Sequence, residues 1–565
     1  MNPFSRLAGL WRHPPVYFAV LTALALATPL AFAPYYRFWL MPLLFAALLH
    51  LFETKPQRRI LSAYWFGFAG YAAQFWWVHT SMHDIGGLPN LYAVPFTLLF
   101  PAFLALFPAI ALWLYGKYRL PRLAGTGIAL PVLWTLCEFA RERVMTGFGW
   151  GALGYSQIAD GSPLAGYAPL GGIHLVTLAA ACCGAWLLLA VHARSLKGRI
   201  LPAAALALLL YGGHALRGTA FTRPAGAPVS VALVQGNIAQ RMKFSPEHYL
   251  ETYQRYYDLV SRTRARIVIL PETAFPQFLQ DLEPGLLEQF ADTAAHNGSA
   301  LALGIPVYAE DGKNYLNAAA NLASFDPEQP DRLQIYAKNH LVPFGEYKPL
   351  PALTGVLYSA MNMPLADFKR GGTGQMPFDM AGQKVAFNIC YEDGFGDELI
   401  ASARTSTMLA NISNMAWFGR SAAKWQQLQQ SQTRALELGR PMLRATNTGA
   451  TAVVSPQGSI LALAAPDTVA VLEAEVQGMQ GSTPYMRTGS SWPLVCALAA
   501  LAVLLLFCRP RRPRPAADSL KKSAPPSDPP EPETAEAAEK TETAPAAEKQ
   551  AVRPARPYCD RRLKW

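Results

Sequence analysis

The sequence predicts a polytopic α-helical membrane protein with an α/β domain inserted before its last helix. Three observations lead to this fold class. Of the 565 residues, 52% are hydrophobic and only 15% are charged, whereas soluble domains average roughly 25% charged residues. Seven apolar stretches fill the first 215 positions, and an eighth ends near position 508. Between them, residues 228–480 alternate strand-like and helix-like runs, which is typical of a layered α/β domain.

The apolar stretches have lengths and neighbours that suit membrane spans. A spanning helix needs about 20 mostly apolar residues. The first stretch is not a cleaved signal peptide, because its apolar run is long and another follows at once. We expect residues 1–215 to hold seven transmembrane helices and residues 489–508 to hold an eighth. The stretches lie near 15–34, 38–52, 61–80, 91–114, 123–140, 170–191, 200–215 and 491–508.

The Lys and Arg residues of the short connections predict the orientation. Alternate connections form two sets, of which one carries fifteen Lys and Arg and the other carries three. Connections rich in Lys and Arg stay in the cytoplasm. Both termini are therefore expected in the cytoplasm, with residues 216–488 on the other side of the membrane. Topology accounts for the net charge of +11, so we expect no nucleic acid partner.

Residues 509–565 have a different composition, rich in Pro, Ala, Glu and Lys. So few large apolar residues cannot form a core, and we expect a disordered cytoplasmic tail. Its first residues, RPRRPRP, are interpreted as a stop-transfer signal, with contact to anionic lipid as the alternative.

The inserted domain shows strands and helices but no cofactor motif. It has no Gly-rich phosphate loop, no CxxC and no Cys/His cluster, so neither a nucleotide nor a metal is expected. The expected helices are 246–264, 283–297 and 421–440, and the expected strands are 229–235, 266–270, 301–308, 384–390, 442–447, 450–456 and 459–465.

Chemically active residues lie where expected strands end. Glu272 follows the strand RIVIL, Cys390 follows KVAFNI, and Lys338 lies between them in the chain. No other cysteine occurs between positions 184 and 495. A thiol in an oxidising compartment is usually paired or used. A nucleophilic thiol needs a base and a cation nearby, which Glu272 and Lys338 can supply. A buried, inert cysteine is the alternative.

These segments resemble the nitrilase superfamily, whose members use a Glu-Lys-Cys triad in an α-β-β-α sandwich. Eight spans with such a domain before the last one are similar to the apolipoprotein N-acyltransferase family, the last enzymes of bacterial lipoprotein maturation. The resemblance covers about residues 1–508. It rests on LVPFGE (341–346), ICYE (389–392), NISNMAWFG (411–419), RALELGRPMLRATNTG (434–449) and TPYMRTG (483–489).

The resemblance implies a role for each site residue. Cys390 is the expected nucleophile and carries the acyl group as a thioester. Glu272 is the expected general base, and Lys338 is expected to stabilise the oxyanion. Glu346 is then the second carboxylate, expected to orient Lys338 or to shuttle protons. Tyr391 and Glu392 are expected to shape the pocket, although Glu346 and Glu392 can also be read as ordinary structural hydrogen-bonding residues.

Two positions depart from the family pattern. Phe244 stands in RMKF where the family often has Trp, and Met415 replaces an Asp in SNMAWFG. An aromatic lid survives the first change, because only the indole N–H is lost. Phe244, Trp417 and Phe418 are candidate substrate or lid contacts, and the two aromatics after Met415 can equally be domain core.

The implied reaction has two steps and no cofactor. A phospholipid, with phosphatidylethanolamine as the expected donor, acylates Cys390. The α-amine of a diacylglyceryl apolipoprotein then takes the acyl chain. The implied location is the bacterial inner membrane, with the catalytic domain in the periplasm and the bilayer itself as a partner.

Two other functions compete with this interpretation. A membrane-anchored nitrilase-type amidohydrolase would use the same triad but pass the acyl group to water. Eight spans are more than an anchor needs. The other competing function is that of a transporter or scaffold. Such a protein usually carries ionisable residues within its spans, whereas the spans of this chain are nearly free of charge apart from Glu138.

Overall fold

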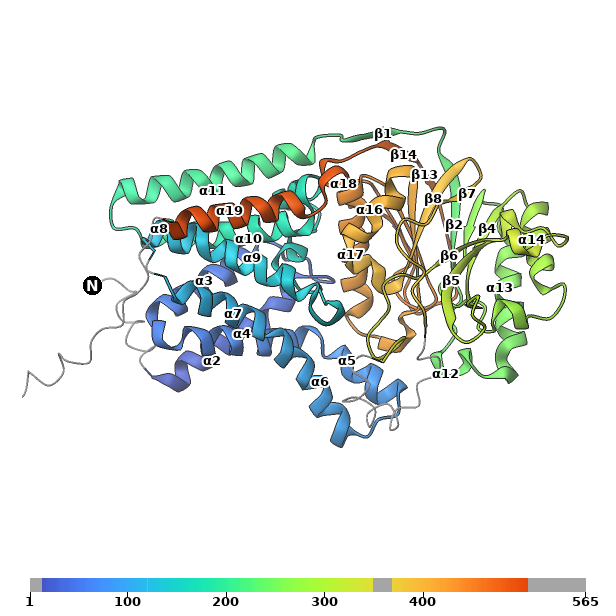
Figure 1. Ribbon diagram of the computed structural model, residues 1–565, viewed down its shortest axis with the longest axis horizontal. Coiled ribbons are helices and arrows are strands. Elements are labelled where there is room, and N and C mark those ends of the chain that lie inside the picture. The colour runs from blue at the N-terminus through green and yellow to red at the C-terminus, as the bar shows by residue number, and fades with distance from the viewer. Residues whose placement is uncertain (1–12, 119, 349–367, 507–565) are drawn as a thin grey trace, which may run out of the picture. The chain divides into compact units, whose positions relative to one another are not determined.

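The computed structural model describes residues 13–118, 120–348 and 368–506 (Figure 1). Two parts are distinguished below. The helical part comprises residues 13–217 and 491–506, and the α/β domain comprises residues 222–488. The predicted tail, 509–565, lies outside the described residues.

The helical part contains one helical segment at each predicted span. Its helices are α2 (Pro14–Ala27), α3 (Leu40–Thr54), α4 (Arg59–Gln74), α5 (Trp77–Thr80), α6 (Asn90–Leu104), α7 (Leu106–Gly116), α8 (Arg122–Ala124), α9 (Leu130–Arg141), α10 (Ala168–His192), α11 (Leu196–Arg217) and α19 (Ser491–Leu506).

Length and composition distinguish these segments. Within the described ranges, five helical segments are long and apolar enough to cross a membrane: 14–31, 90–116, 122–141, 163–192 and 196–217. Helices α3 and α19 are apolar but shorter. The eight-span topology therefore stays a prediction.

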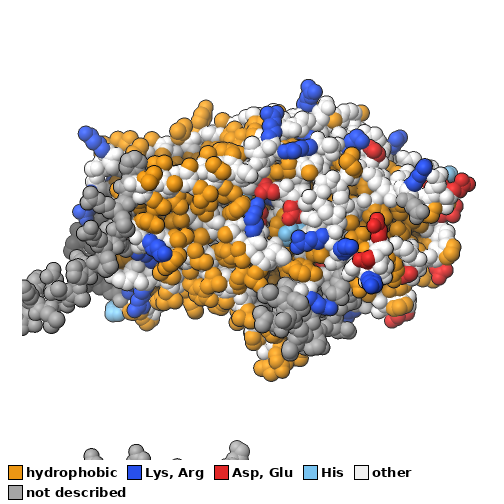
Figure 2. Space-filling model, viewed as in Figure 1, with side chains coloured by type: hydrophobic (Ala, Val, Ile, Leu, Met, Phe, Trp, Pro, Cys, Tyr) orange, Lys and Arg blue, Asp and Glu red, His pale blue; other side chains and the backbone are white. Residues whose placement is uncertain are grey.

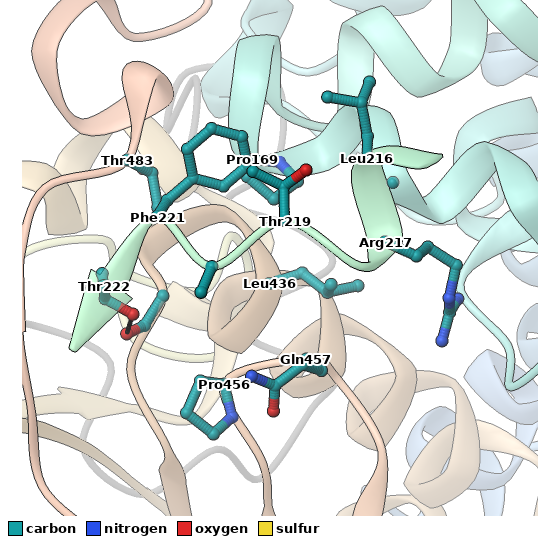
Figure 3. A pocket seen from close by; sticks show the side chains of 13 residues that line it. Pro169, Leu216, Arg217, Thr219, Phe221, Thr222, Leu436, Pro456, Gln457 and Thr483 are labelled. Atoms are coloured by element: carbon teal, nitrogen blue, oxygen red, sulfur yellow. Dashed lines mark hydrogen bonds between the residues drawn. The ribbon is translucent and has the colours of Figure 1, made fainter. Parts of the chain in front are cut away.

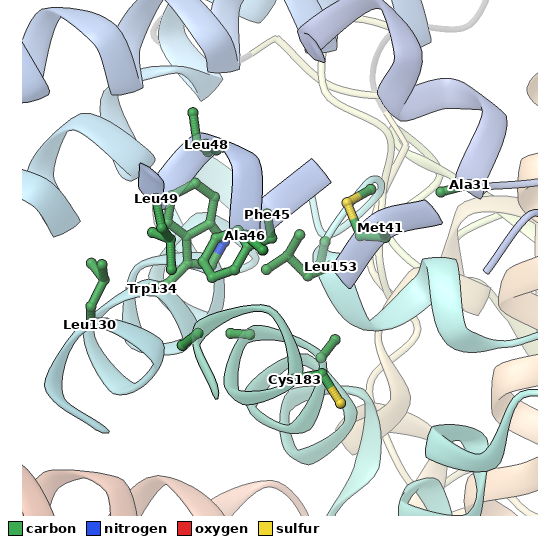
Figure 4. Close-up of a cluster of buried hydrophobic side chains, with 14 of the residues drawn as sticks. Ala31, Met41, Phe45, Ala46, Leu48, Leu49, Leu130, Trp134, Leu153 and Cys183 are labelled. Atoms are coloured by element: carbon green, nitrogen blue, oxygen red, sulfur yellow. The ribbon is translucent and has the colours of Figure 1, made fainter. Parts of the chain in front are cut away.

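Small residues let α10 run through the middle of the helical part. A Cβ on Gly184 would lie 2.8 Å from the carbonyl oxygen of Pro42 and 2.9 Å from the Phe45 ring, so only glycine allows this approach to α3. Phe45 in turn meets Trp134 of α9 edge to face at 5.0 Å (Figure 4). In lipid, helices associate through such close contacts rather than through the hydrophobic effect.

The surface of the helical part is apolar, whereas the surface of the α/β domain carries both apolar and charged side chains. Figure 2 shows hydrophobic side chains covering the helices, while acidic residues gather mainly over the domain. Leu99 of α6 and Leu208 of α11 are 61% and 71% exposed. An exposed apolar surface of this kind marks a membrane or protein contact.

The α/β domain is built on two six-stranded mixed sheets. The first has the order β13 (Ala470–Val476), β2 (Val229–Gln235), β3 (Ile267–Ile269), β4 (Ala300–Tyr308), β5 (Tyr315–Asn321) and β6 (Gln334–Ala337). The second has the order β12 (Ile460–Leu463), β11 (Ala452–Val454), β10 (Met442–Thr446), β9 (Met408–Ser413), β8 (Gln383–Ile389) and β7 (Phe378–Met380). A short pair, β1 (Thr222–Pro224) and β14 (Met479–Gly481), joins the ends of the domain.

Strands β2, β3 and β4 run parallel, as do β8, β9 and β10, so their carboxyl ends share an edge in each sheet. Loops at such an edge commonly form binding sites in α/β folds. Glu272 follows β3 and Cys390 follows β8.

Helices cover the outer face of each sheet. One apolar core lies between the sheets and includes Leu233, Ile269 and Phe387. Two further cores lie between the sheets and their helices. The helices are α12 (Gln240–Lys243), α13 (Tyr249–Arg262), α14 (Leu286–His296), α16 (Gly396–Thr405), α17 (Ala423–Leu438) and α18 (Pro484–Thr488). This α-β-β-α sandwich confirms the expected fold class.

Helix α17 joins the domain to the helical part. All its residues except Trp425 are buried, although most are polar. Gln429 donates to the carbonyl of Ile158 at 2.9 Å and accepts from the backbone N–H of Ala33 at 3.1 Å. Glu437 accepts from the backbone N–H of Ile173 at 2.7 Å. These hydrogen bonds fix the face of α17 that meets the helical part.

Candidate active site

Three loops bring the predicted residues together. Glu272 follows β3, Lys338 follows β6 and Cys390 follows β8. The Lys338 Nζ atom lies 3.6 Å from Glu272 Oε1. Cys390 opens a 3₁₀ turn, Cys390–Gly394, and its φ of 55° is in the left-handed region that non-glycine residues rarely adopt. Such strain is typical of functional sites, where the surrounding structure maintains it.

Lys338 is an ammonium held between two carboxylates. Its side chain is 1% exposed and donates to Glu346 Oε1 at 2.8 Å. Burial alone would lower the pKa of Lys338, but Glu346 and Glu272 outweigh burial and raise that pKa above its ordinary value. The residue therefore remains a cation, which suits it to stabilise a developing oxyanion.

Asn317 of β5 joins the same two carboxylates. Its Nδ2 atom donates to Glu272 Oε1 at 2.8 Å and to Glu346 Oε1 at 2.9 Å. The other oxygen of Glu346 accepts from the Val342 backbone N–H at 2.8 Å. Glu346 thus contacts Lys338 and Asn317 through one oxygen and the Val342 backbone through the other, and its role in orienting Lys338 stays a prediction. Asn317 was not predicted as a site residue, because nothing in a run of small residues on a strand distinguishes it.

Glu272 is fixed through both of its carboxylate oxygens. Its second oxygen accepts from the backbone N–H of Asn414 at 2.8 Å. Gly304 of β4 lies directly behind Pro271 and Glu272, where a Cβ would approach within 2.7 Å of the Glu272 Cα. The carboxylate that is expected to act as the base therefore has a single position.

The Cys390 thiol is protonated at rest. Burial, together with the carboxylate of Glu272, raises the pKa of this thiol to about 12, and Lys338 only partly opposes them. Gln427 of α17 donates to the Sγ atom at 3.7 Å. A neutral thiol needs a base at the moment of attack, and Glu272 is the carboxylate that acts on the thiol most strongly.

A buried polar network supports the nucleophile from below. Arg444 of β10 is fully buried and donates to Gln427 at 2.6 Å and to Asn411 at 2.7 Å. Asn411 donates in turn to the Cys390 carbonyl at 3.3 Å. Arg444 also pairs with Asp393 at 3.1 Å. This network fixes the turn that carries Cys390, and the sequence analysis had quoted Arg444 only as part of a family string.

Glu392 connects the Lys338 loop to the Cys390 turn. It accepts from the backbone N–H groups of Asn339 at 2.7 Å and Ile389 at 2.6 Å, and from the Tyr336 hydroxyl at 2.9 Å. Burial raises its pKa to about 7 against the effect of these donors. Its contacts are those of a residue that positions the two loops.

Tyr391 faces the helical part. Its hydroxyl donates to the carbonyl of Gly147 at 2.6 Å, and its ring stacks near Phe148 with the centroids 6.5 Å apart. It belongs to an aromatic cluster shared by both parts, which includes Phe75, Trp77 and Trp150.

The candidate lid residues are placed differently from one another. The Phe418 ring meets Trp77 of α5 at 4.8 Å, so this side chain contacts the helical part. Phe244 and Trp417 are half-buried. Met415 is buried in the aromatic cluster, which agrees with its apolar side chain. Their contact with substrate stays a prediction.

Lys243 is a site residue that the sequence analysis passed over in RMKF. It is fully buried, and its Nζ atom donates to the Glu272 carbonyl at 2.9 Å. Burial lowers the pKa of Lys243 to about 7, although Glu272 and Cys390 favour its charged form. It thus contacts the main chain of Glu272, whereas Lys338 lies near the carboxylate.

A separate small pocket lies where α11 leads into β1, against the end of α17 (Figure 3). None of its described lining residues belongs to the predicted site.

No group of three or more His, Cys, Asp or Glu side chains in the described ranges is arranged to hold a metal ion.

Comparison with known proteins covers both parts of the chain. The family model of carbon-nitrogen hydrolases matches residues 230–485, and that of the apolipoprotein N-acyltransferase N-terminal domain matches residues 24–186. Three curated relatives carry the name apolipoprotein N-acyltransferase.

The relative from Neisseria meningitidis serogroup B is 57% identical over 89% of this chain and 98% of its own length. The relative from Chromobacterium violaceum is 50% identical over 87% and 94%. The relative from Nitrosomonas europaea is 40% identical over 86% and 97%. Since these matches extend over nearly the whole length of each relative, this chain belongs to the apolipoprotein N-acyltransferase family.

Proposed function

We propose that this protein transfers an acyl chain from a phospholipid, through a thioester on Cys390, to the N-terminal α-amine of a diacylglyceryl apolipoprotein. The observation that carries the proposal is the half-buried Cys390 thiol, which interacts with the paired Glu272 carboxylate and Lys338 ammonium, in a domain that shares an aromatic cluster with apolar helices. Family membership supports acyl transfer over hydrolysis.

In the first half-reaction, the Cys390 Sγ atom attacks the ester carbonyl of the phospholipid while Glu272 takes the thiol proton. The oxyanion of the tetrahedral intermediate lies beside the Lys338 ammonium. Such a donor is worth on the order of 3 kcal/mol in the transition state. The ester C–O bond then breaks, Glu272 returns the proton to the leaving alkoxide, and a lysophospholipid departs.

In the second half-reaction, the neutral α-amine attacks the thioester carbonyl. Glu272 takes a proton from the attacking nitrogen and Lys338 again faces the oxyanion. The C–S bond breaks, and Glu272 gives its proton to the Cys390 sulfur. The enzyme is thereby regenerated and the product is an amide. This order of steps predicts ping-pong kinetics.

The apolar helices suit substrates that stay in a bilayer. Removing an acyl chain from a membrane costs about 0.8 kcal/mol per CH₂, so both substrates must reach Cys390 from the lipid. We infer a location in the bacterial inner membrane with residues 216–488 in the periplasm. Phosphatidylethanolamine is the proposed donor, because it is the phospholipid that the family resemblance implies.

The direct test is intact-mass analysis of the purified protein after incubation with phosphatidylethanolamine alone, with Cys390→Ala alongside. We expect a mass gain of one acyl chain that hydroxylamine removes and that the variant lacks. Adding a diacylglyceryl-cysteine peptide should then discharge the enzyme and give the N-acyl peptide.

Two results would contradict the proposal. An active enzyme that is never acylated would exclude the covalent mechanism. An acyl-enzyme that releases only fatty acid in the presence of the peptide would favour the amidohydrolase alternative. Phosphatidylglycerol in place of phosphatidylethanolamine tests the headgroup separately from the chemistry.

A further inference from the structure

A loop of the helical part contacts both arms of the candidate site. Residues 143–149 follow α9, and two successive carbonyls of this loop accept hydrogen bonds from the α/β domain. The Thr146 carbonyl lies 2.9 Å from His340 Nε2, and the Gly147 carbonyl accepts from the Tyr391 hydroxyl at 2.6 Å. His340 is two residues beyond Lys338, and Tyr391 is next to Cys390.

The backbone of this loop is strained at the residues that make these contacts. Met145, Thr146 and Gly147 have φ angles of 55°, 71° and 84°. The left-handed region is unfavourable for Met and more so for a β-branched Thr. A Cβ on Gly147 would collide with the carbonyl oxygen of Glu142. Strain of this kind persists only where other contacts require it, and here it accompanies both carbonyl contacts.

The His340 ring faces a hydrogen-bond acceptor on each side. Its Nε2 atom meets the Thr146 carbonyl, which cannot donate, and its Nδ1 atom lies 2.9 Å from Glu398 Oε1. The other oxygen of Glu398 accepts from Asn339 at 2.7 Å. Each ring nitrogen therefore lies against an acceptor, and the ring stacks on Phe395 with the centroids 3.4 Å apart.

Two carboxylates face His340. Glu398 of α16 lies against its ring, and Glu392 on the Cys390 turn accepts from its backbone N–H at 3.1 Å. Arg143 of the loop pairs with Asp397 of α16 at 2.9 Å. The contacts of the loop with the domain thus include this ion pair, the two carbonyl contacts and the Phe148–Tyr391 ring contact.

We propose that residues 143–149 form a latch through which the helical part holds the Lys338 arm and the Cys390 arm in their reactive positions. His340 and Tyr391 are its positioning residues. The proposal rests on the proposed function, since acylation of Cys390 is the step that the latch serves. It assigns the helical part a role in catalysis beside its role as a membrane support.

Four single variants and one double variant test the latch. His340→Phe keeps the stacked ring and removes both ring nitrogens. His340→Gln restores one N–H toward Thr146. Tyr391→Phe removes only the hydroxyl. Gly147→Ala displaces the loop, and Gly161→Ala is its matched control, because Gly161 has a similar φ of 83° but a Cβ there meets only the Phe38 ring, at 4.0 Å.

We expect the acylation rate of Cys390 at saturating phospholipid to fall about 10–100-fold in His340→Phe, Tyr391→Phe and Gly147→Ala, as for loss of a hydrogen bond to a positioned group. The phospholipid concentration for half-maximal rate should stay within about threefold. Gly161→Ala should acylate like the native protein, and His340→Gln should recover part of the loss. The double variant Gly147→Ala/Tyr391→Phe should acylate no more slowly than Gly147→Ala alone, because both substitutions break the same contact between Gly147 and Tyr391.

The alkylation rate of Cys390 by iodoacetamide separates failure of the latch from failure of the proposed function. If the native protein is never acylated, the proposed function is wrong, and a changed alkylation rate in the latch variants still supports the latch. Latch variants that match the native protein in both rates would overturn the latch. Variants that differ from the native protein only in a higher half-saturating phospholipid concentration, or only in a lower unfolding temperature, would also overturn the latch.

Discussion

The charge on Glu272 suppresses the reactivity of the residue it is proposed to assist. Burial and the Glu272 carboxylate raise the pKa of Cys390, while Lys338 lowers it. The thiol is therefore almost fully protonated near neutral pH, and its reaction with a thiolate-selective reagent should rise about tenfold per pH unit without a plateau below pH 10.

Two substitutions should shift this reactivity in opposite directions. Glu272→Gln removes the negative charge, so it should lower the pKa of Cys390 and speed alkylation at pH 8 about tenfold while abolishing acyl transfer. Lys338→Met should slow alkylation. The measurement is the iodoacetamide rate from pH 7 to 10, with Cys390→Ala as the blank. Slower alkylation in Glu272→Gln would show that the charge does not govern the thiol.

Lys243 makes the stability of the fold depend on pH. Burial lowers the pKa of Lys243 to about 7, whereas an unfolded lysine titrates near a pKa of roughly 10.4. Between these values the unfolded chain binds a proton that the folded chain does not, so the folded state gains stability as pH rises from 7 to 10. Below pH 7 both states are protonated, and the charged form is buried at its full cost.

The unfolding temperature of Lys243→Met should accordingly rise less with pH than that of the native protein over this window. Thermal unfolding in detergent at pH 6, 7, 8, 9 and 10 measures the difference in unfolding temperature between the two proteins. Other titrating groups are common to both proteins and cancel in this difference. Lys313→Met, at an exposed position, is the control. Parallel curves for the native protein and Lys243→Met would contradict the assignment.

Residue chemistry was more predictable from the sequence than residue packing. Glu272 and Cys390 could be named because each follows an expected strand, and Lys338, Glu346 and the Tyr391-Glu392 pair because their segments resemble those of a known family. Lys243 and Asn317 could not, because a lysine on one turn and an asparagine on a strand become site residues only through distant contacts. The hydrogen bonds that define them reach Glu272 from positions 29 and 45 residues away.

At the scale of elements, strands with strong β-branched patterns were predicted and others were not. The expected strand 229–235 coincides with β2, and 301–308 differs from β4 by one residue. Strands β5 and β9 were missed, since YLNAAAN and MLANIS combine small and polar residues that have low strand propensity. They form because both lie in sheets whose neighbours bury them.

Helix α17 was predicted as a helix, but its two-sided burial was not. Its sequence, AKWQQLQQSQTRALEL, has the polarity of a surface helix. Its glutamines instead meet backbone groups of the helical part: Gln426 donates to the Gln74 carbonyl at 3.1 Å and accepts from Trp77 Nε1 at 3.1 Å. From a single sequence, a polar helix that is buried between two parts of a protein cannot be distinguished from one that is exposed to solvent.

These glutamines should therefore contribute to stability. Gln429→Leu leaves the Ala33 N–H and the Ile158 carbonyl without their partner, and each unpaired buried group costs about 1–3 kcal/mol. We expect a lower unfolding temperature for Gln429→Leu and Gln426→Leu. Gln289→Leu, on the exposed face of α14, should have little effect. Equal unfolding temperatures in all three would show that the contacts between the parts carry no stability.

At the scale of the whole molecule, the orientation in the membrane follows from charge rather than from the fold. Figure 2 shows an apolar surface over the helices, which fits either orientation. The excess of Lys and Arg in alternate connections predicts one of them. We therefore expect Gln57 and Lys197 in the cytoplasm and Asp84 and Lys313 outside it, all four being exposed positions.

Single cysteines at these four positions test the orientation, in a background with the seven native cysteines replaced. A membrane-impermeant maleimide applied to cells with an opened outer membrane should label Asp84→Cys and Lys313→Cys at once. Gln57→Cys and Lys197→Cys should react only after the inner membrane is disrupted. Because Asp84 and Gln57 lie at opposite ends of the third predicted span, labelling of both from outside would remove that crossing. Labelling of Lys313→Cys only after the inner membrane is disrupted would instead place Cys390 in the cytoplasm, where the proposed lipoprotein acceptor does not occur.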